Sequence, residues 1–422
     1  MSSLSRRSLL LSSAALAGLP ALATTARPGK RLVVVFAKGG WDTSYVLDPK
    51  RHVVGVEGPE VDTTGDPRDV ELVRHYGDIA IGVNDLKRPA VSNFFERYAE
   101  RLAIVRGLYV GSIGHDLSRT RLLTGTDSTA RPDLTVIAGH EQGAWAPVGC
   151  VDLSNLQFVG DYAASTLRLG TRGQIESLAA THGFYPAPES LGITYPLHAP
   201  DPADQDLVRA HLEGRIRRMQ GTLGDPGAVA ALDGHLESLD RAHRFREAAG
   251  DLPLTSGSTI MEKASMAVEL LSRGLCHTVL MDDESDWDTH YDTKSQHNLN
   301  EGLFRGLSSL AVGLESAGLL DETLVLVVSE MTRSPLRNDF GGKDHWPHTS
   351  IFMFGGGVQG GRIVGGTNDR LESLPVDLES GDLWTDGAIP KYDNLLAGVL
   401  EHLDIDPGRW LPGVAPYRCL HG

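Results

Sequence analysis

The sequence predicts an α/β protein in which helices cover both faces of a mostly parallel sheet. The first observation is a set of short, β-branched apolar runs, typical of buried parallel strands, at residues 31–37, 102–106, 277–281, 323–328 and 350–354. The second is a set of helical patterns at residues 92–101, 258–273, 297–317 and 391–403. Strands that alternate with helices favour crossover connections, which place successive strands in parallel.

The predicted elements follow one another along the chain with few interruptions. The first strand, RLVVVFA at 31–37, ends before Gly39-Gly40, where the chain can turn tightly. The helix at 258–273 is followed by Gly274, a residue that commonly ends helices, and leads to the strand at 277–281. The whole mature chain, residues 27–422, is therefore expected to form a single α/β domain.

Residues 126–257 break this alternation. They contain proline-rich loops between Pro186 and Pro202 and a charged pair of helical patterns at 205–219 and 226–248. We interpret this segment as an inserted cap or subdomain within the single domain. A separate second domain is the alternative interpretation.

Residues 1–26 have the features of a cleaved export signal. Arg6-Arg7 stands directly before a short apolar run that ends near Leu19, and Ala21-Leu22-Ala23 offers a small-residue cleavage site. The paired arginines favour the twin-arginine export machinery over the general secretory route. The mature chain is then expected in the periplasm or outside the cell. Because no later segment approaches 18 apolar residues, no stable membrane span is expected.

The composition excludes several classes of partner. With 39 Lys and Arg against 55 Asp and Glu, the formal net charge is −16, which argues against binding to nucleic acids or anionic membranes. Cys150, Cys276 and Cys419 lie far apart and lack metal-ligand spacing. We expect them to be small, mostly buried apolar side chains.

Four polar clusters follow predicted strands, where open α/β sheets bind their ligands, and a fifth comes just before the last predicted strand. These clusters are GGWDTS at 39–44, GHDLSR at 114–119, DDESDWDTH at 282–290, SE at 329–330 and DHWPH at 344–348. Carboxylates and imidazoles that converge from several strand ends are the ligands that a divalent cation with mixed nitrogen and oxygen coordination requires.

Within these clusters the spacing leaves alternatives open. Asp288 and His290 could share one ion in a loop, whereas Asp286 and His290 would share one face of a helix. His348 competes with His345 for the role of late histidine ligand. Two other carboxylates in these clusters also have simpler possible roles. Asp42 could be a turn residue or helix cap, and Glu330 a paired surface carboxylate.

Several of these segments resemble a known family. The chain is similar to the bacterial exported family called domain of unknown function 1501, within the alkaline phosphatase/sulfatase superfamily. The segments that carry the resemblance are the double-arginine leader, GGWDT at 39–43, WDTH at 287–290, SEMTRSP at 329–335, KDHWP at 343–347 and GGGVQGGRIVGGT at 355–367. The resemblance implies an alkaline-phosphatase/sulfatase-like three-layer sandwich. It also implies the metal ligands Asp42, Asp288, His290, Glu330 and His345.

The segment HDLSRTRLLTG, residues 115–125, resembles the sulfatase signature CSPSRAALLTG. His115 stands in place of the nucleophilic cysteine of that signature, which argues against formylglycine chemistry. His115 is then a metal ligand, a nucleophile or a general base, and we favour the metal ligand. Arg119, one helical turn further on, suits an anionic substrate oxygen, with a structural ion pair as its alternative role.

Together these features predict an exported metal-dependent hydrolase of a phosphate ester, a sulfate ester or a related small anion. It would use metal-activated water or His115, with one or two divalent ions. Zinc or manganese is favoured, and calcium or magnesium would also fit an oxygen-rich site. The alternative is a non-catalytic exported binding or accessory protein on the same fold. A third interpretation is an interaction scaffold that uses residues 126–257.

Overall fold

The computed structural model describes residues 29–59, 65–168, 184–185, 195–196, 202–249, 252 and 259–418. The export signal predicted at residues 1–26 and Cys419 lie outside these residues. Among the helices so described, none is long and apolar enough to cross a bilayer.

Eight strands of the described chain form one central sheet, in the order β14-β4-β13-β10-β1-β9-β5-β6. Neighbouring strands run parallel except β13, which runs antiparallel to both β4 and β10. The strands are β14 (Arg362–Gly365), β4 (Leu102–Tyr109), β13 (His348–Gly355), β10 (Thr323–Val328), β1 (Arg31–Phe36), β9 (Cys276–Asp282), β5 (Val148–Asp152) and β6 (Thr166–Arg168). All five predicted strands are present, and the predicted mostly parallel sheet is confirmed.

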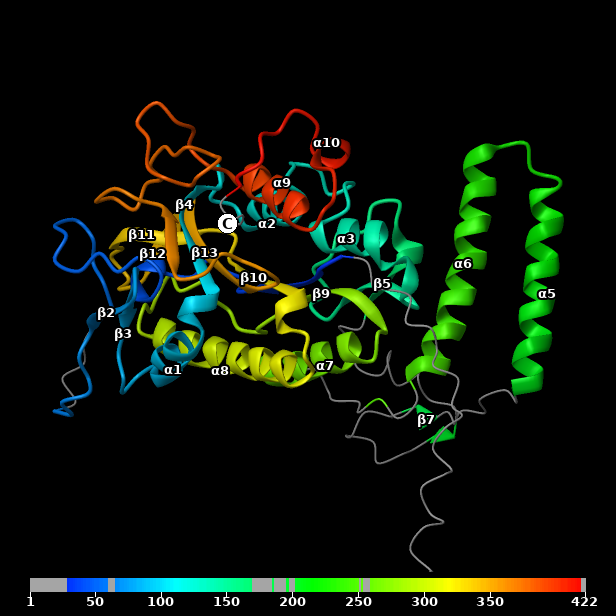
Figure 1. Ribbon diagram of the computed structural model, residues 1–422, viewed down its shortest axis with the longest axis horizontal. Helices are drawn as coiled ribbons and strands as arrows, with labels where there is room; N and C mark the ends of the chain where they lie inside the picture. Colours follow the sequence, from blue (N-terminus) through cyan, green and yellow to red (C-terminus); the bar gives the residue numbers. More distant parts are fainter. Residues whose placement is uncertain are drawn as a thin grey trace, which may run out of the picture.

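Helices cover both faces of this sheet, so the predicted three-layer α/β sandwich is also confirmed (Figure 1). One face carries α1 (Pro89–Tyr98), α7 (Ile260–Ser272) and α8 (Ser295–Ser316). The other carries α2 (His115–Thr124), α3 (Leu134–Gln142), α9 (Tyr392–His402) and α10 (Pro407–Trp410). The central strands β1, β9 and β10 are buried along their whole length, because each is covered on both sides.

Smaller elements surround the sandwich. Two hairpins, β2 (Leu72–Tyr76) with β3 (Ile79–Val83) and β11 (Thr332–Arg337) with β12 (Lys343–Trp346), are antiparallel. A short pair is formed by β7 (Phe184–Tyr185) and β8 (Tyr195–Pro196). The helices α5 (Pro202–Gln220) and α6 (Pro226–Ala249) extend side by side away from the sheet (Figure 1).

The predicted insertion at 126–257 includes residues that belong to the sandwich itself. Its first part supplies α3, β5 and β6 to the sandwich, and only the later part, with α5 and α6, departs from it. The strand β5 was missed because its sequence, VGCVD, is short and has a glycine that interrupts the apolar run. It is nevertheless fully buried, because it pairs with β9 on one side and β6 on the other.

The strand register brings the polar segments to one edge of the sheet. Phe36 at the end of β1 pairs with Val328 of β10 and with Asp282 of β9, so the loops that follow these three strands leave the sheet together. Because β13 is antiparallel, its beginning lies at the same edge, where His348 pairs with Tyr109 at the end of β4.

Candidate metal centre

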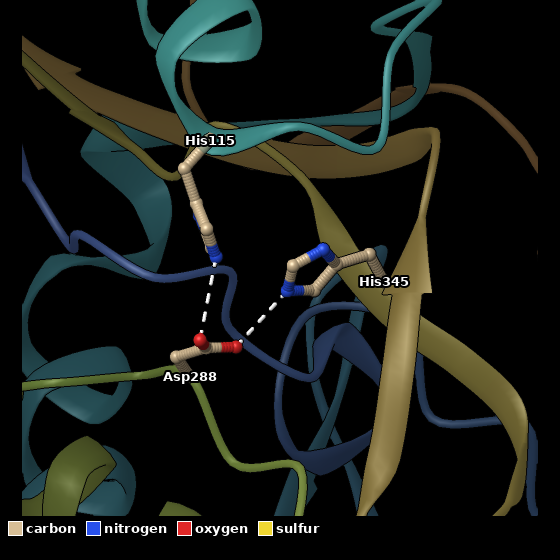
Figure 2. Close-up of side chains that lie close together, drawn as sticks. All are labelled: His115, Asp288 and His345. Carbon is tan, nitrogen blue, oxygen red and sulfur yellow. Dashed lines mark hydrogen bonds and ion pairs between the residues drawn. The ribbon is translucent and has the colours of Figure 1, made fainter.

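Three side chains from distant parts of the chain meet at this edge. His115 is the first residue of α2, Asp288 lies in the loop after β9, and His345 lies in β12. Figure 2 shows both imidazoles directed at the Asp288 carboxylate, one at each oxygen. Ligand atoms of the three residues all lie within 4.8 Å of one another, so they could bind one ion.

A third histidine adds to this group. The Nε2 atom of His345 lies 3.0 Å from Asp288 Oδ1, and the Nε2 atom of His290 lies 3.1 Å from the same oxygen. The two Nε2 atoms are only 2.9 Å apart. On the other carboxylate oxygen, His115 Nε2 lies 3.4 Å from Asp288 Oδ2. Three imidazole Nε2 atoms therefore converge on one carboxylate.

The second nitrogen of each imidazole is held by an acceptor. His115 Nδ1 lies 2.8 Å from Glu330 Oε1, and His345 Nδ1 lies 2.7 Å from the carbonyl oxygen of Ile113. His290 Nδ1 lies 3.1 Å from Asp344 Oδ1. Because carboxylate and carbonyl oxygens only accept hydrogen bonds, we assign a proton to each Nδ1.

This assignment leaves three Nε2 lone pairs facing the carboxylate when the imidazoles are neutral. Such an arrangement is repulsive unless protons or a cation lie among the four groups. Two ligand atoms on one zinc ion, each about 2.0–2.1 Å from it, lie within roughly 4 Å of each other. The close approach of His290, His345 and Asp288 meets this condition. The residues therefore fit a divalent cation.

Glu330, another predicted metal ligand, lies outside the group of His115, Asp288 and His345 and contacts His115. Its side chain is buried, and its carboxylate accepts a hydrogen bond from the Gly39 backbone N–H at 2.8 Å as well as the contact from His115. The hydrogen bond to Glu330, followed by its charge and that of Asp288, raises the pKa of His115. Carboxylates that accept the second N–H of a metal-ligating histidine orient the ring and increase its basicity.

Arg333 holds Asp288 in its ionised form. Its guanidinium is buried and lies 2.7 Å from Asp288 Oδ1. Partial burial opposes ionisation of Asp288, but its contacts with His345 and with the cationic Arg333 outweigh it and lower its pKa to about 2. The same guanidinium donates to the carbonyl oxygens of Gly40, at 2.7 Å, and of Trp287, at 3.0 Å. One arginine thus ties the loops after β1 and β9 to β11.

Tight backbone packing fixes these loops. Gly39 has a φ of +118°, and a Cβ there would lie 2.7 Å from the backbone nitrogen of Asp288. A Cβ at Gly342 would lie 2.0 Å from the carbonyl carbon of His290. Trp287 is fully buried, and its indole N–H donates to Asp283 Oδ2 at 2.6 Å. These contacts leave little freedom for the segment that carries Asp288 and His290.

Asp42, a predicted metal ligand, lies outside the group of His115, Asp288 and His345. Its Oδ2 atom lies 2.8 Å from Lys343 Nζ, and neither side chain is exposed. Its other oxygen accepts hydrogen bonds from the backbone N–H and the hydroxyl of Ser44, as in the predicted role of helix cap. A metal-binding role for Asp42 stays a prediction.

The structure separates the alternatives that the spacing left open. Asp286 is exposed, and its carboxylate accepts from the Asp288 backbone N–H at 3.1 Å, so Asp288 is the member of the group. His348 Nδ1 lies 2.7 Å from Ser373 Oγ, and burial lowers its pKa to about 4. His345, and not His348, reaches Asp288.

Arg119, the predicted contact for a substrate anion, interacts with two neighbouring side chains. Its guanidinium hydrogen-bonds Asp116 Oδ1 at 3.2 Å and lies over the ring of Phe158, 5.7 Å from its centre. These contacts match the structural ion pair that was its alternative role.

Sequence reasoning did not single out four residues that shape the centre. Arg333 and Lys343 are buried cations, Asp344 holds His290, and Asn338 donates to both the His290 carbonyl, at 3.0 Å, and Asp344, at 2.9 Å. Arg333, Lys343 and Asp344 all fall within SEMTRSP and KDHWP. The family-like segments therefore pointed to these three residues, but only the fold shows which carboxylate each cation contacts.

Comparison with known proteins gives one family match. The model of a family described as "Protein of unknown function (DUF1501)" matches residues 203–381, which is less than half of the chain. This range includes Asp288, His290, Glu330 and His345, but not His115. No curated protein matches the chain.

Several solved structures are similar over most of the chain. The lipoteichoic acid synthase LtaP from Listeria monocytogenes has a TM-score of 0.39 at 8% identity, covering 93% of this chain and 76% of that chain. The PsFucS1 sulfatase from Pseudoalteromonas sp. has a TM-score of 0.39 at 10% identity, covering 93% of this chain and 72% of that chain. A putative sulfatase from Bacteroides thetaiotaomicron has a TM-score of 0.37 at 9% identity, covering 93% and 74%. Because these scores lie below 0.5, the architecture above rests on the chain's own strands and helices.

Proposed function

We propose that this chain is an exported, metal-dependent hydrolase of a phosphate ester, a sulfate ester or a related small anion, working in the periplasm or outside the cell. The observation that carries the proposal is the convergence of the Nε2 atoms of His115, His290 and His345 on Asp288. Acceptors at all three Nδ1 atoms support it, because metal-ligating histidines are oriented in this way. Nitrogen and carboxylate donors favour zinc or manganese over calcium or magnesium.

A divalent cation at such a site supplies Lewis-acid chemistry, since it polarises an ester oxygen and lowers the pKa of water. The side chains would hold and orient the ion, and Glu330 would keep the Nδ1 proton of His115 in place. The ordering of the loop by Arg333 reduces the reorganisation that ligand binding requires. Because α2 begins at His115, the positive end of its dipole lies at the centre and favours an anionic substrate.

Metal analysis and a substrate panel test the proposal together. The full chain is expressed with its own leader, and the exported protein is analysed for zinc, manganese, calcium and magnesium. An aryl phosphate, an aryl phosphodiester and an aryl sulfate then report hydrolysis. We expect His115→Ala and His345→Ala to lose both metal and activity, whereas the matched control His348→Ala keeps both. Metal-free protein, with hydrolysis unchanged in these variants, would contradict the proposal.

One observation favours a second candidate, a non-catalytic exported binding protein. Arg119, which the sequence offered as the contact for the substrate anion, is occupied by Asp116 and Phe158. The same experiment separates the two functions. Bound metal without hydrolysis of any ester on the panel would favour the binding protein.

A further inference from the structure

A second buried carboxylate beside the centre already has a cation. The side chains of Asp42 and Lys343 are both 0% exposed, and Lys343 Nζ lies 2.8 Å from Asp42 Oδ2. In the part of the chain that the structure describes, neither atom has a well-directed hydrogen bond. The contact is therefore mainly Coulombic, and the ammonium acts as a compact point charge.

This ion pair adjoins the proposed metal ligands. Lys343 and His345 are two residues apart in β12, so both side chains lie on the same face of the strand. The carbonyl oxygen of Lys343 accepts from Arg333 at 3.3 Å, and Arg333 also contacts Asp288 at 2.7 Å. Asp42 belongs to the loop after β1, in which the Gly39 N–H donates to Glu330 at 2.8 Å.

The charges of these residues balance one divalent cation better than two. Apart from Asp344, whose side chain is 63% exposed and therefore largely solvated, the carboxylates of Asp42, Asp288 and Glu330 bring three formal negative charges, and Arg333 and Lys343 return two. With neutral imidazoles the remaining charge is −1. One divalent cation changes it to +1, whereas two would leave +3 among largely buried groups, and uncompensated buried charge is costly.

We infer that the centre takes one metal ion per chain, and that the Lys343 ammonium stands where a second cation would otherwise neutralise Asp42. This inference rests on the proposed metal centre. Asp42 is then a positioning residue that holds Lys343 and the loop after β1, and it does not bind metal. An anionic substrate would meet a single ion together with the start of α2.

The stoichiometry of metal binding tests the inference directly. Purified full-length protein is saturated with zinc, desalted and analysed by mass spectrometry for zinc per chain. We expect one ion. We expect the double variant Asp42→Asn/Lys343→Met, which removes both charges together, to keep one ion and a zinc Kd within threefold of the wild type. Two ions in the wild type, or a loss of affinity greater than tenfold in the double variant, would overturn the inference.

The single variant Lys343→Met gives an independent readout, because it leaves Asp42 without its cation. We expect zinc beyond the first equivalent to raise the Tm of this variant. It should not raise the Tm of the wild type, the double variant or the control Lys38→Met, which removes an exposed lysine. An equal response in all four proteins would refute the role of Lys343. If Lys343→Met does not fold, the number of zinc ions per wild-type chain and the zinc Kd of the double variant still test the inference. A wild-type count of zero refutes the metal centre and the proposed function, whereas a count of two refutes only this inference.

Discussion

The contact between Glu330 and His115 predicts how strongly the centre binds its metal. One carboxylate oxygen, Glu330 Oε1, lies 2.8 Å from both His115 Nδ1 and the Gly39 nitrogen. In Glu330→Gln the amide oxygen can occupy this position and keep both short hydrogen bonds. The charge is lost, together with the longer contacts that the Gly39 N–H, at 3.1 Å, and Ser329 Oγ, at 3.4 Å, make to Glu330 Oε2. Charge-assisted hydrogen bonds contribute about 1.5–3 kcal/mol and neutral ones about 0.5–1.5 kcal/mol. A loss of about 1–1.5 kcal/mol corresponds to zinc binding that is roughly tenfold weaker.

Glu330→Gln should also lower the pH at which zinc affinity is lost. The hydrogen bond to Glu330 raises the pKa of His115, and a proton on Nε2 competes with metal. Zinc affinity is therefore lost as the pH falls through that raised pKa. Glu330→Gln lowers the pKa of His115, so the variant binds more weakly at neutral pH but keeps its remaining affinity to lower pH.

Titration calorimetry with zinc, over a series from about pH 5 to 8 where imidazole titrates, measures both effects. The matched control is Glu322→Gln, which removes an exposed carboxylate that pairs with Arg31 beside the other end of β10. An unchanged Kd in Glu330→Gln, or a loss of affinity at the same pH as in the wild type, would refute the reasoning.

Three further predictions concern stability. Lys343→Met breaks a fully buried ion pair, so we expect the free energy of unfolding in urea to fall by about 3–5 kcal/mol. Asp42→Asn/Lys343→Met should recover part of that loss, and equal losses in both variants would contradict the pairing. Burial lowers the pKa of His277 to about 4, so protons bind the unfolded chain first and stability falls as the pH drops from about 6.5 towards that value. We expect His277→Gln to reduce this fall by up to about 3 kcal/mol. Urea unfolding at a series of pH values measures it, and the same dependence of the unfolding free energy on pH in the variant and the wild type would refute the prediction. Zinc at 100 times its Kd should stabilise the metal-free protein by about 2.7 kcal/mol, and a Tm that a chelator leaves unchanged would speak against a bound ion.

The sheet and its covering helices could be predicted from the sequence because burial imposes a strong pattern. A strand covered on both faces must be apolar along its length, as RLVVVF and TLVLVV are. Shorter strands leave a weaker pattern, and β5, β6 and β14 were missed. The antiparallel direction of β13 has no local signature either, because its sequence, HTSIFMFG, suits both orientations. Pairing with β4 and β10 decides it.

By itself the sequence also determined where the functional groups gather, because carboxylates and imidazoles follow the ends of its predicted strands. Only the tertiary structure decided which of them meet. Spacing along a loop does not define where a side chain points, so the sequence favoured Asp288 over Asp286 only slightly. The contacts of Gly39 and Arg333 with Asp288 fix the position of that residue. In the same way the sequence offered Asp42 as a metal ligand, and only the fold shows that the hairpin of β11 and β12 places Lys343 against it. A buried carboxylate is costly unless a cation pairs with it, and the fold decides which cation lies close enough to do so.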